Sequence, residues 1–247
     1  WGQPGGPYGV TYTSAARTSL PTMGVTGVAV ADLNADGRME VIFANTQNDT
    51  STAIDSYIYW GQVGGVFGIQ YSASARTGLP TNAATGVTVV NLNNDRIPEI
   101  IFSNDNDIFI YWGQYGGSYG VVYSITNRTI LPALRAFTVA AADLNNDNLI
   151  DIVIANQRSG NNFDVSSYVY WGQAGGPNGT NYTSTLRTDL PGVGVNKASI
   201  ADLNNDGSRD VFLQGWFQDF TRIFWGPIPV GGTAVVSWTL PVNYDSF

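Results

Sequence analysis

The stretch Asp32-Leu33-Asn34-Ala35-Asp36-Gly37-Arg38-Met39-Glu40 has three further related copies in the chain, at residues 91–99, 143–151 and 202–210. In every copy, oxygen-bearing side chains stand at positions one, three, five and nine of the phrase. Successive copies begin 59, 52 and 59 residues apart. Recurrence at such intervals is the signature of a repeat architecture, so this stretch predicts the fold of the whole chain as well as the chemistry of a loop.

Two other short motifs, here called phrases, recur at similar intervals to the Asp-Leu-Asn stretch, which is called the acidic phrase below. A Trp-Gly pair begins at residues 1, 60, 112, 171 and 225, and a Leu-Pro pair begins at residues 20, 79, 131, 190 and 240. We therefore predict a single repeat domain over residues 1–247. Its parts are a half-blade of residues 1–21, repeats of approximately 22–80, 81–132, 133–191 and 192–241, and a tail of residues 242–247.

Each repeat reads as four strands. Val25–Ala31 is a nearly continuous apolar run, which is typical of a strand buried on both faces. Glu40–Ala44 and Tyr57–Trp60 are rich in β-branched and aromatic residues, and Gln70–Arg76 is a more polar fourth strand. Buried inner strands and polar outer strands predict an all-β chain, a β-propeller built from four-stranded antiparallel blades. Another β-solenoid or a trefoil-like array is the alternative.

The chain begins in the middle of a phrase, because other units have an aromatic strand before their Trp-Gly pair. We therefore expect the sequence to be a processed form or a fragment, with residues 1–21 as an orphan half-blade that lacks its inner strands. An unpaired half-sheet exposes strand edges. It would close the ring against the last unit or complete a blade in another chain, and exchange that does not close would give a fibre.

Composition narrows the range of functions. The chain has no histidine and no cysteine, which removes the commonest general base and the thiolate nucleophile. Glycosidase chemistry needs two carboxylates facing each other across a cleft, and no such pair stands out, so we predict no catalytic residues and no enzyme activity. The formal net charge of −8 argues against nucleic acid as a partner. No apolar run is long enough to insert into a membrane.

The acidic phrases predict structural calcium, because a hard cation needs several oxygens from one tight loop. Position seven would contribute its carbonyl. The expected ligands in three loops are Asp32, Asn34, Asp36, Arg38 and Glu40; Asp143, Asn145, Asp147, Leu149 and Asp151; and Asp202, Asn204, Asp206, Ser208 and Asp210. The second loop is a weaker set, consisting of Asn91, Asn93, Asp95, Ile97 and Glu99.

The alternative for these loops is that the Asp and Asn side chains only cap their own tight turns. Position six then needs a left-handed backbone, which suits Gly37 and Gly207. Arg96 occupies that position in the second loop, so we expect this loop to turn differently.

The tryptophans also have two interpretations. Those that end apolar strands either pack between blades or form a ring of aromatic platforms on which sugars stack. In the second interpretation, the glutamine that follows each Trp-Gly pair would hydrogen-bond sugar hydroxyls. The candidate ligand-binding residues are Trp60, Gln62, Trp112, Gln114, Trp171, Gln173 and the unpatterned Trp216.

The phrase Asp-Leu-Asn-x-Asp-Gly-x-x-Asp/Glu, followed by an apolar strand and an aromatic-Trp-Gly strand, resembles FG-GAP/VCBS repeats, the integrin-alpha-like blades. The resemblance covers nearly the entire chain and implies a β-propeller with calcium in loops 32–40, 143–151 and 202–210. Family members include adhesion domains and fungal or bacterial propeller lectins, whose sugar sites lie between blades. Family propellers commonly have six to eight blades, whereas this chain has four acidic loops.

Two functions follow as expectations. The first is a non-catalytic, carbohydrate-binding, lectin-like protein that is secreted, extracellular or on the cell surface, with glycans or a cell-surface or matrix molecule as partner. The second is a structural or adhesive module of a surface assembly or filament. This module would form a homo-oligomer by exchanging the N-terminal half-blade.

Overall fold

The structure is a computed structural model that describes residues 2–4, 10–216, 220–235 and 238–241. Helix in these residues is limited to the 3₁₀ turns Ser14–Ala16 and Ile125–Asn127. None of the helical segments in these ranges has the length and apolar character needed to cross a bilayer. The predicted all-β class is confirmed.

In the described residues, four larger sheets follow one another along the chain, each built on four antiparallel strands in sequence order from the inside outward. The first contains β3 (Val25–Ala31), β4 (Glu40–Asn45), β5 (Ala53–Tyr59) and β8 (Arg76–Asn82). The second contains β9 (Gly86–Val90), β10 (Glu99–Ser103), β11 (Asp107–Tyr111) and β14 (Arg128–Pro132). The third contains β15 (Ala136–Ala142), β16 (Asp151–Asn156), β17 (Ser167–Tyr170) and β20 (Arg187–Leu190), and β24 (Gly232–Thr233) adds a parallel strand to β20. The fourth contains β21 (Val195–Ala201), β22 (Asp210–Gly215), β23 (Phe220–Phe224) and β25 (Trp238–Pro241).

A short hairpin belongs to each of the first three sheets. These hairpins pair β6 (Gln62–Val63) with β7 (Ile69–Gln70), β12 (Gln114–Tyr115) with β13 (Val121–Val122), and β18 (Gln173–Ala174) with β19 (Thr180–Asn181). The N-terminal pair of β1 (Gly2–Pro4) and β2 (Val10–Tyr12) repeats this pattern.

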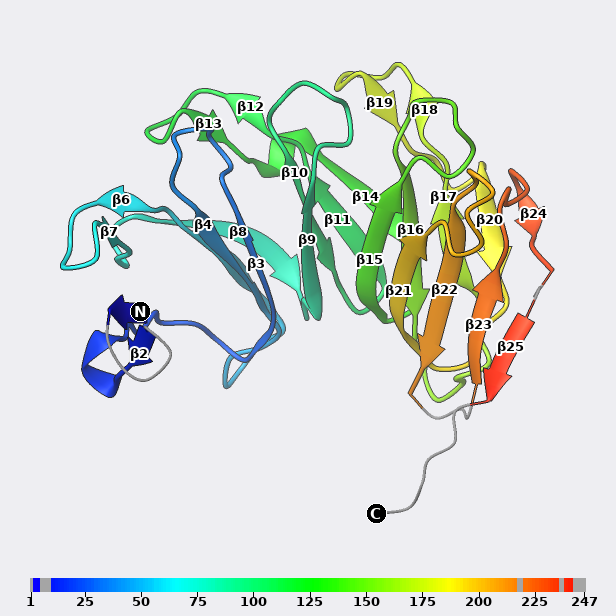
Figure 1. Ribbon diagram of the computed structural model, residues 1–247, viewed down its shortest axis with the longest axis horizontal. Helices are drawn as coiled ribbons and strands as arrows, with labels where there is room; N and C mark the ends of the chain where they lie inside the picture. Colours follow the sequence, from blue (N-terminus) through cyan, green and yellow to red (C-terminus); the bar gives the residue numbers. More distant parts are fainter. Residues whose placement is uncertain (1, 5–9, 217–219, 236–237, 242–247) are drawn as a thin grey trace, which may run out of the picture.

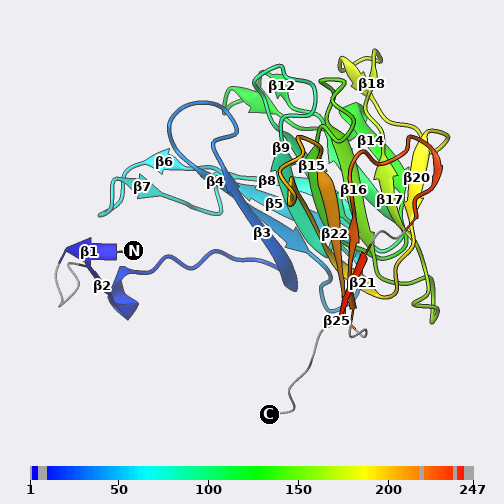
Figure 2. The same ribbon diagram turned by 45° about the vertical axis from the view of Figure 1, so that its right-hand side comes forward.

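The sheets stand along an arc, with the first at one end and the fourth at the other (Figure 1). Their inner strands β3, β9, β15 and β21 lie side by side on the concave side, as the turned view in Figure 2 also shows. The acidic loops connect β3 to β4 and the equivalent strands of the other sheets, so all of them lie at one end of the inner strands. The architecture is therefore that of a β-propeller, with four blades arranged in an arc.

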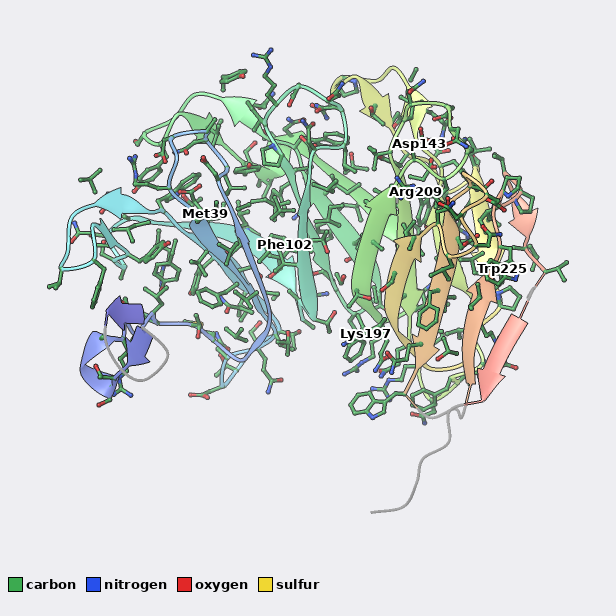
Figure 3. All side chains as sticks on the ribbon, in the orientation of Figure 1. Met39, Phe102, Asp143, Lys197, Arg209 and Trp225 are labelled. Carbon is green, nitrogen blue, oxygen red and sulfur yellow. The ribbon has the colours of Figure 1, made fainter. Side chains whose placement is uncertain are left out.

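The core consists of three apolar layers between neighbouring blades. In the first layer, Ile42 and Ile58 of one blade pack against Phe102 and Tyr111 of the next. Figure 3 shows Phe102 between the first two blades. The other two layers use the equivalent positions of the later blades. The second and third blades are covered on both faces and are apolar on both sides, whereas the first and fourth blades are each covered by a neighbouring blade on one face. The predicted burial of Val25–Ala31 on both faces is therefore wrong, because Val28 and Val30 are 58% and 59% exposed.

The predicted position of the fourth strand is wrong. Residues 69–70 form half of a short hairpin, and the outer strand of the blade is Arg76–Asn82, which pairs with β5. Pro80 lies within this strand, opposite Asp55. An outer strand tolerates proline because one of its edges needs no N–H donor.

The N-terminal half-unit contacts the first blade through its Leu-Pro phrase. The Tyr59 hydroxyl donates a hydrogen bond to the carbonyl of Pro21. In the second blade, the Tyr111 hydroxyl donates to the carbonyl of Pro80, and in the third blade the Tyr170 hydroxyl donates to the carbonyl of Pro132. Both acceptors lie on the outer strand of the preceding blade. Pro21 thus occupies the position of a preceding blade's outer edge.

Candidate functional site: acidic loops and the grooves between blades

The acidic loops hold their shape by hydrogen bonds from their own backbone. In the third loop, the two carboxylate oxygens of Asp143 accept the N–H groups of Asp147 and Asn148 at 3.1 and 2.9 Å. The side-chain oxygen of Asn145 accepts the same Asp147 N–H at 3.1 Å, and Asp147 Oδ1 accepts the N–H of Leu149 at 2.8 Å. The first and fourth loops repeat these contacts. This network is the turn-capping arrangement.

The second loop keeps the same backbone turn, which corrects the expectation that it would turn differently. Arg96 has φ of +80°, close to the +82° of Gly37 and the +89° of Gly207. Asn91 replaces the acid at position one, and this replacement removes hydrogen bonds from the loop. Asn91 Oδ1 is buried and has no hydrogen-bond partner in the described structure. The loop therefore keeps its shape with fewer hydrogen bonds.

The carboxyl group at position nine is fully buried and joins two of the repeated phrases. In the first loop, Glu40 accepts the N–H of Leu33 at 2.8 Å and the N–H of Gly61 at 3.3 Å. Asp151 and Asp210 make the same pair of contacts in the third and fourth loops. The acidic phrase and the Trp-Gly phrase recur together because this carboxyl group connects them.

The glycine of the Trp-Gly pair is required by close packing against the acidic loop. A Cβ atom placed on Gly61 would lie 2.7 Å from the carbonyl oxygen of Met39, which is labelled in Figure 3. Such a contact is closer than van der Waals packing permits, so a side chain at this position would push the loop away from the blade.

Burial perturbs the titration of Glu40, Glu99 and Asp151. Desolvation raises the pKa of Glu40 to about 7, that of Glu99 to about 8 and that of Asp151 to about 6. Hydrogen bonds from backbone N–H groups oppose the rise, and the other carboxylates of each loop add to it. These carboxyl groups thus retain a proton at a higher pH than exposed acids do.

The predicted calcium ligands lie together at positions one, three and five of each loop. Their oxygens fit calcium chemically, and those of Asp143 and Asn145 already converge on one N–H group. The ninth carboxylates of the first, third and fourth loops, those of Glu40, Asp151 and Asp210, are engaged with backbone N–H groups instead. In the described ranges, no group of three or more acidic side chains is arranged to hold a metal ion. Calcium binding stays a prediction, and the donors at positions one, three and five are the ones that fit it.

The patterned tryptophans are packing residues, so their proposed use as sugar platforms is corrected. Trp60, Trp112 and Trp171 are only 1–2% exposed, and their rings lie in the layers between blades. Their indole N–H groups donate to Thr77, Thr129 and Thr188 at 2.8 to 2.9 Å. A ring buried in this way has no face available for a ligand.

The glutamines after the tryptophans lie closer to the surface. Gln62 and Gln114 line two grooves between neighbouring blades, whereas Gln173 donates a hydrogen bond to the Thr183 hydroxyl at 3.2 Å. Trp216 is 55% exposed and contacts Phe137.

The first groove lies between the first and second blades. One wall is formed by Asn34, Asp36 and Arg38 of the acidic loop, and Gln62 follows on the same blade. The other wall is the tip of the β12–β13 hairpin, where Tyr119 stacks on Trp60 at 4.5 Å between ring centroids. The Asn34 side-chain amide donates to the Tyr119 carbonyl at 2.9 Å, which fixes the two walls relative to each other.

The second groove occupies the equivalent place between the second and third blades. Its walls use loop positions three, five and seven, the Gly-Gln-x segment and the next hairpin tip, as in the first groove. The lining residues are Asn93, Asp95, Ile97, Gly113, Gln114, Tyr115, Pro177, Asn178 and Gly179. The two cavities measure about 540 and 330 Å³, within the usual range for small-molecule sites.

Two tyrosines near these grooves were not among the predicted site residues. Tyr119 lines the first groove, and Tyr115 lines the second with 76% of its surface exposed. One signal for Tyr119 is present in the sequence, because an aromatic-Gly pair follows the Gly-Gly pair at residues 8–9, 67–68 and 119–120. The hairpin-tip position of that pair depends on the fold and is not evident from the phrase alone.

The sequence matches the family described as FG-GAP-like repeat over residues 32–102, 91–154 and 143–213. Each match runs from one acidic loop into the β-strand that follows the next. A search of curated proteins finds no match. FG-GAP-like repeats occur in extracellular or cell-surface proteins, and propellers of this kind are typically non-enzymatic.

Proposed function

The chain belongs to the FG-GAP-like repeat family, and on this premise we propose that it is a non-catalytic, secreted or cell-surface protein that binds carbohydrate. The observation that carries this proposal is the recurrence of one groove at two equivalent places between blades. Repeated shallow sites suit glycans, because glycans present repeated units.

The chemistry of the groove walls supports the same ligand class. Sugar hydroxyls both donate and accept hydrogen bonds, and Asn, Gln and Asp side chains supply both kinds of partner. The half-exposed Tyr119 ring, backed by Trp60, offers an apolar face of the kind that packs against the C–H face of a pyranose. Because both walls are fixed by the fold, binding requires little reorganisation.

A glycan array with the 247-residue chain tests the proposal. We expect binding to a defined set of neutral glycans and at least a tenfold loss of affinity in Gln62→Ala combined with Gln114→Ala. Gln47→Ala changes an exposed glutamine that lines neither groove and is the matched control. Absence of binding to all glycans, or equal affinity in the two variants, would overturn the proposal.

The proposal includes structural calcium in the first, third and fourth loops. The donors would be the oxygens at positions one, three and five, and the ion would supply charge neutralisation between two strands. We expect calcium to raise the melting temperature, Asp143→Ala combined with Asp202→Ala to reduce the rise, and Asn91→Ala to leave it unchanged. A melting temperature that does not respond to calcium or to a chelator would contradict this part.

A second candidate function, assembly into a larger surface structure, is favoured by the exposed ends of the arc. Leu203 is 51% exposed, whereas the equivalent Leu33, Leu92 and Leu144 are 1–2% exposed because a following blade covers them. At the other end, Val30 is 59% exposed. The exposed face of the fourth blade is equivalent to the face that each earlier blade presents to the next one, and the exposed face of the first blade is equivalent to the face that each later blade presents to the previous one. The first blade of a second copy could therefore pack against the fourth blade, head to tail.

Light scattering tests this second function. Association that is lost on deleting residues 1–21 or in Leu203→Ser would support head-to-tail assembly. A monomer at all concentrations would exclude it for this chain.

A further inference from the structure

A third groove, distinct from the two between neighbouring blades, runs along the concave side of the arc and is lined by all four inner strands. Each strand contributes equivalent residues in three successive tiers. The tiers are Thr26, Thr85, Phe137 and Asn196; then Gly27, Gly86, Thr138 and Lys197; then Val28, Val87, Val139 and Ala198. The cavity measures about 640 Å³ and lies at the end of the inner strands opposite the acidic loops. Figure 3 shows Lys197 at that end and Asp143 at the other.

The last two blades break the repeat within this groove. In the first two blades, Thr26 and Thr85 donate their hydroxyls to carbonyls of the following blade, at Ala84 and Ala136. Phe137 replaces threonine in the third blade, and its ring meets the half-exposed Trp216 edge-on at 6.3 Å. Departure from a repeat at equivalent positions of one cavity is expected where a site for a single ligand has been added to the scaffold.

The groove also holds two of the chain's eleven basic residues, Lys197 and Arg135. Lys197 is the single lysine in a sequence with a net charge of −8. It is exposed, and the ion pairs of the described residues involve other side chains, so no described carboxylate lies within 4.0 Å of its ammonium group. Arg135 lies in the same groove, with Asp105 at 3.6 Å from its guanidinium. The three charges sum to one uncompensated positive charge.

Two polar atoms of the groove have no partner. Nε of Arg135 and Oδ1 of Asn196 are buried and make no hydrogen bond within the described structure. A donor and an acceptor without partners are costly unless a ligand or water satisfies them. The groove thus combines an unpaired cation, an unused donor and acceptor, and an aromatic edge.

We propose that this groove binds one sugar residue that carries a carboxylate, a uronic acid. The Lys197 ammonium would pair with the carboxylate through a charge-assisted hydrogen bond. Asn196 and Arg135 would meet ring hydroxyls, and Phe137, whose ring Trp216 contacts edge-on, would cover the apolar face of the sugar ring. This inference rests on the proposed carbohydrate-binding function and adds an acid-selective site to the neutral grooves between blades.

The test compares glucuronate with glucose, which share a ring and differ by a carboxylate in place of a hydroxymethyl group. Each is titrated into the 247-residue chain and followed by chemical-shift changes of backbone amides. We expect glucuronate to shift amides of residues 135–139 and 195–199 and to bind at least tenfold more tightly there than glucose. Lys197→Gln should lose at least tenfold in glucuronate affinity, and Lys197→Arg should retain most of it.

Arg209→Gln is the matched control, because it removes an exposed cation at the acidic-loop end, as Figure 3 shows. It should leave glucuronate binding unchanged. Equal affinities for the two sugars, unchanged affinity in Lys197→Gln, or no shifts near Lys197 would each overturn the inference. The proposed function would stand even if this inference failed, provided that neutral glycans still bind and that Gln62→Ala combined with Gln114→Ala weakens their binding.

Discussion

Three buried carboxyl groups at position nine, those of Glu40, Glu99 and Asp151, have strongly perturbed titration. Burial raises the pKa of Glu40, Glu99 and Asp151 to about 7, 8 and 6. Between pH 4.5 and these values, the folded chain keeps protons that the unfolded chain loses, so stability falls as pH rises. We therefore expect the free energy of unfolding in urea, with a chelator present, to be lower at pH 8 than at pH 5.

Glu99→Gln provides the control for this pH dependence. The variant removes one of the titrating groups and keeps a side chain of similar shape, so its stability should change less between pH 5 and pH 8. A wild-type chain that becomes more stable over this range would contradict the account of these buried acids.

The backbone at position four of each acidic loop adopts a left-handed conformation, and the resulting strain can be tested. Ala35 has φ of +57°, and the equivalent Asn94, Asn146 and Asn205 lie at +59° to +60°. Alanine pays about 1–2 kcal/mol in this left-handed region, whereas asparagine tolerates it. We expect Ala35→Asn to raise the free energy of unfolding by up to about 1 kcal/mol. Asn205→Ala, measured in the same urea titrations, should lower it; effects of the same sign in both variants would be inconsistent with backbone strain.

Among the elements, the third and outer strands of the first three blades are linked by a hydrogen bond from a buried tryptophan at the end of the third strand to a threonine of the outer strand. Thr129→Val removes the acceptor of the Trp112 indole N–H and leaves that donor unsatisfied in the core. We expect a loss of about 1–3 kcal/mol in the free energy of unfolding. Thr126→Val changes an exposed hydroxyl and should cost less than about 0.5 kcal/mol. Equal losses in the two variants would show that the indole contact is unimportant.

The sequence was informative where local pattern decides the element. Val25–Ala31 is the first inner strand as expected, because a continuous apolar run bounded by an acidic turn has few alternatives. Its expected burial on both faces is not met, since one face of this strand belongs to the uncovered end of the arc. The outer strand was placed too early, because the short pair of residues 62–63 with residues 69–70 consumes the segment that looked like a strand. Contacts across the sheet decide which segment pairs with β5. The strand propensity of a single segment carries no information about these contacts.

The site was predictable to a similar extent. The loop residues and the groove glutamines were identified from their phrases, because these residues recur in register with the blades. The role of Glu40 as a link to Gly61 was not, since it depends on a contact between segments 21 residues apart. The groove positions of Tyr119 and Lys197 became visible only when the fold brought neighbouring blades together.

At the scale of the whole molecule, the two ends of the arc differ from the interior in energy. Leu144→Ala should cost about 2–5 kcal/mol, because the side chain is buried between the third and fourth blades. Leu203→Ala removes an equivalent side chain that is 51% exposed and should cost less than about 0.5 kcal/mol in a dilute monomer. If the two variants lost equal free energy of unfolding at low protein concentration, Leu203 would have to be buried by some contact that is absent from the arc of four blades.

The central claim is that equivalent grooves between successive blades bind carbohydrate. The most direct test is a crystal structure of the 247-residue chain with the neutral glycan that binds most tightly. The account predicts sugar beside Asn34, Gln62 and Tyr119, and again beside Asn93, Gln114 and Asn178. Sugar bound at unrelated places, or crystals saturated with glycan in which both grooves hold only water, would contradict it.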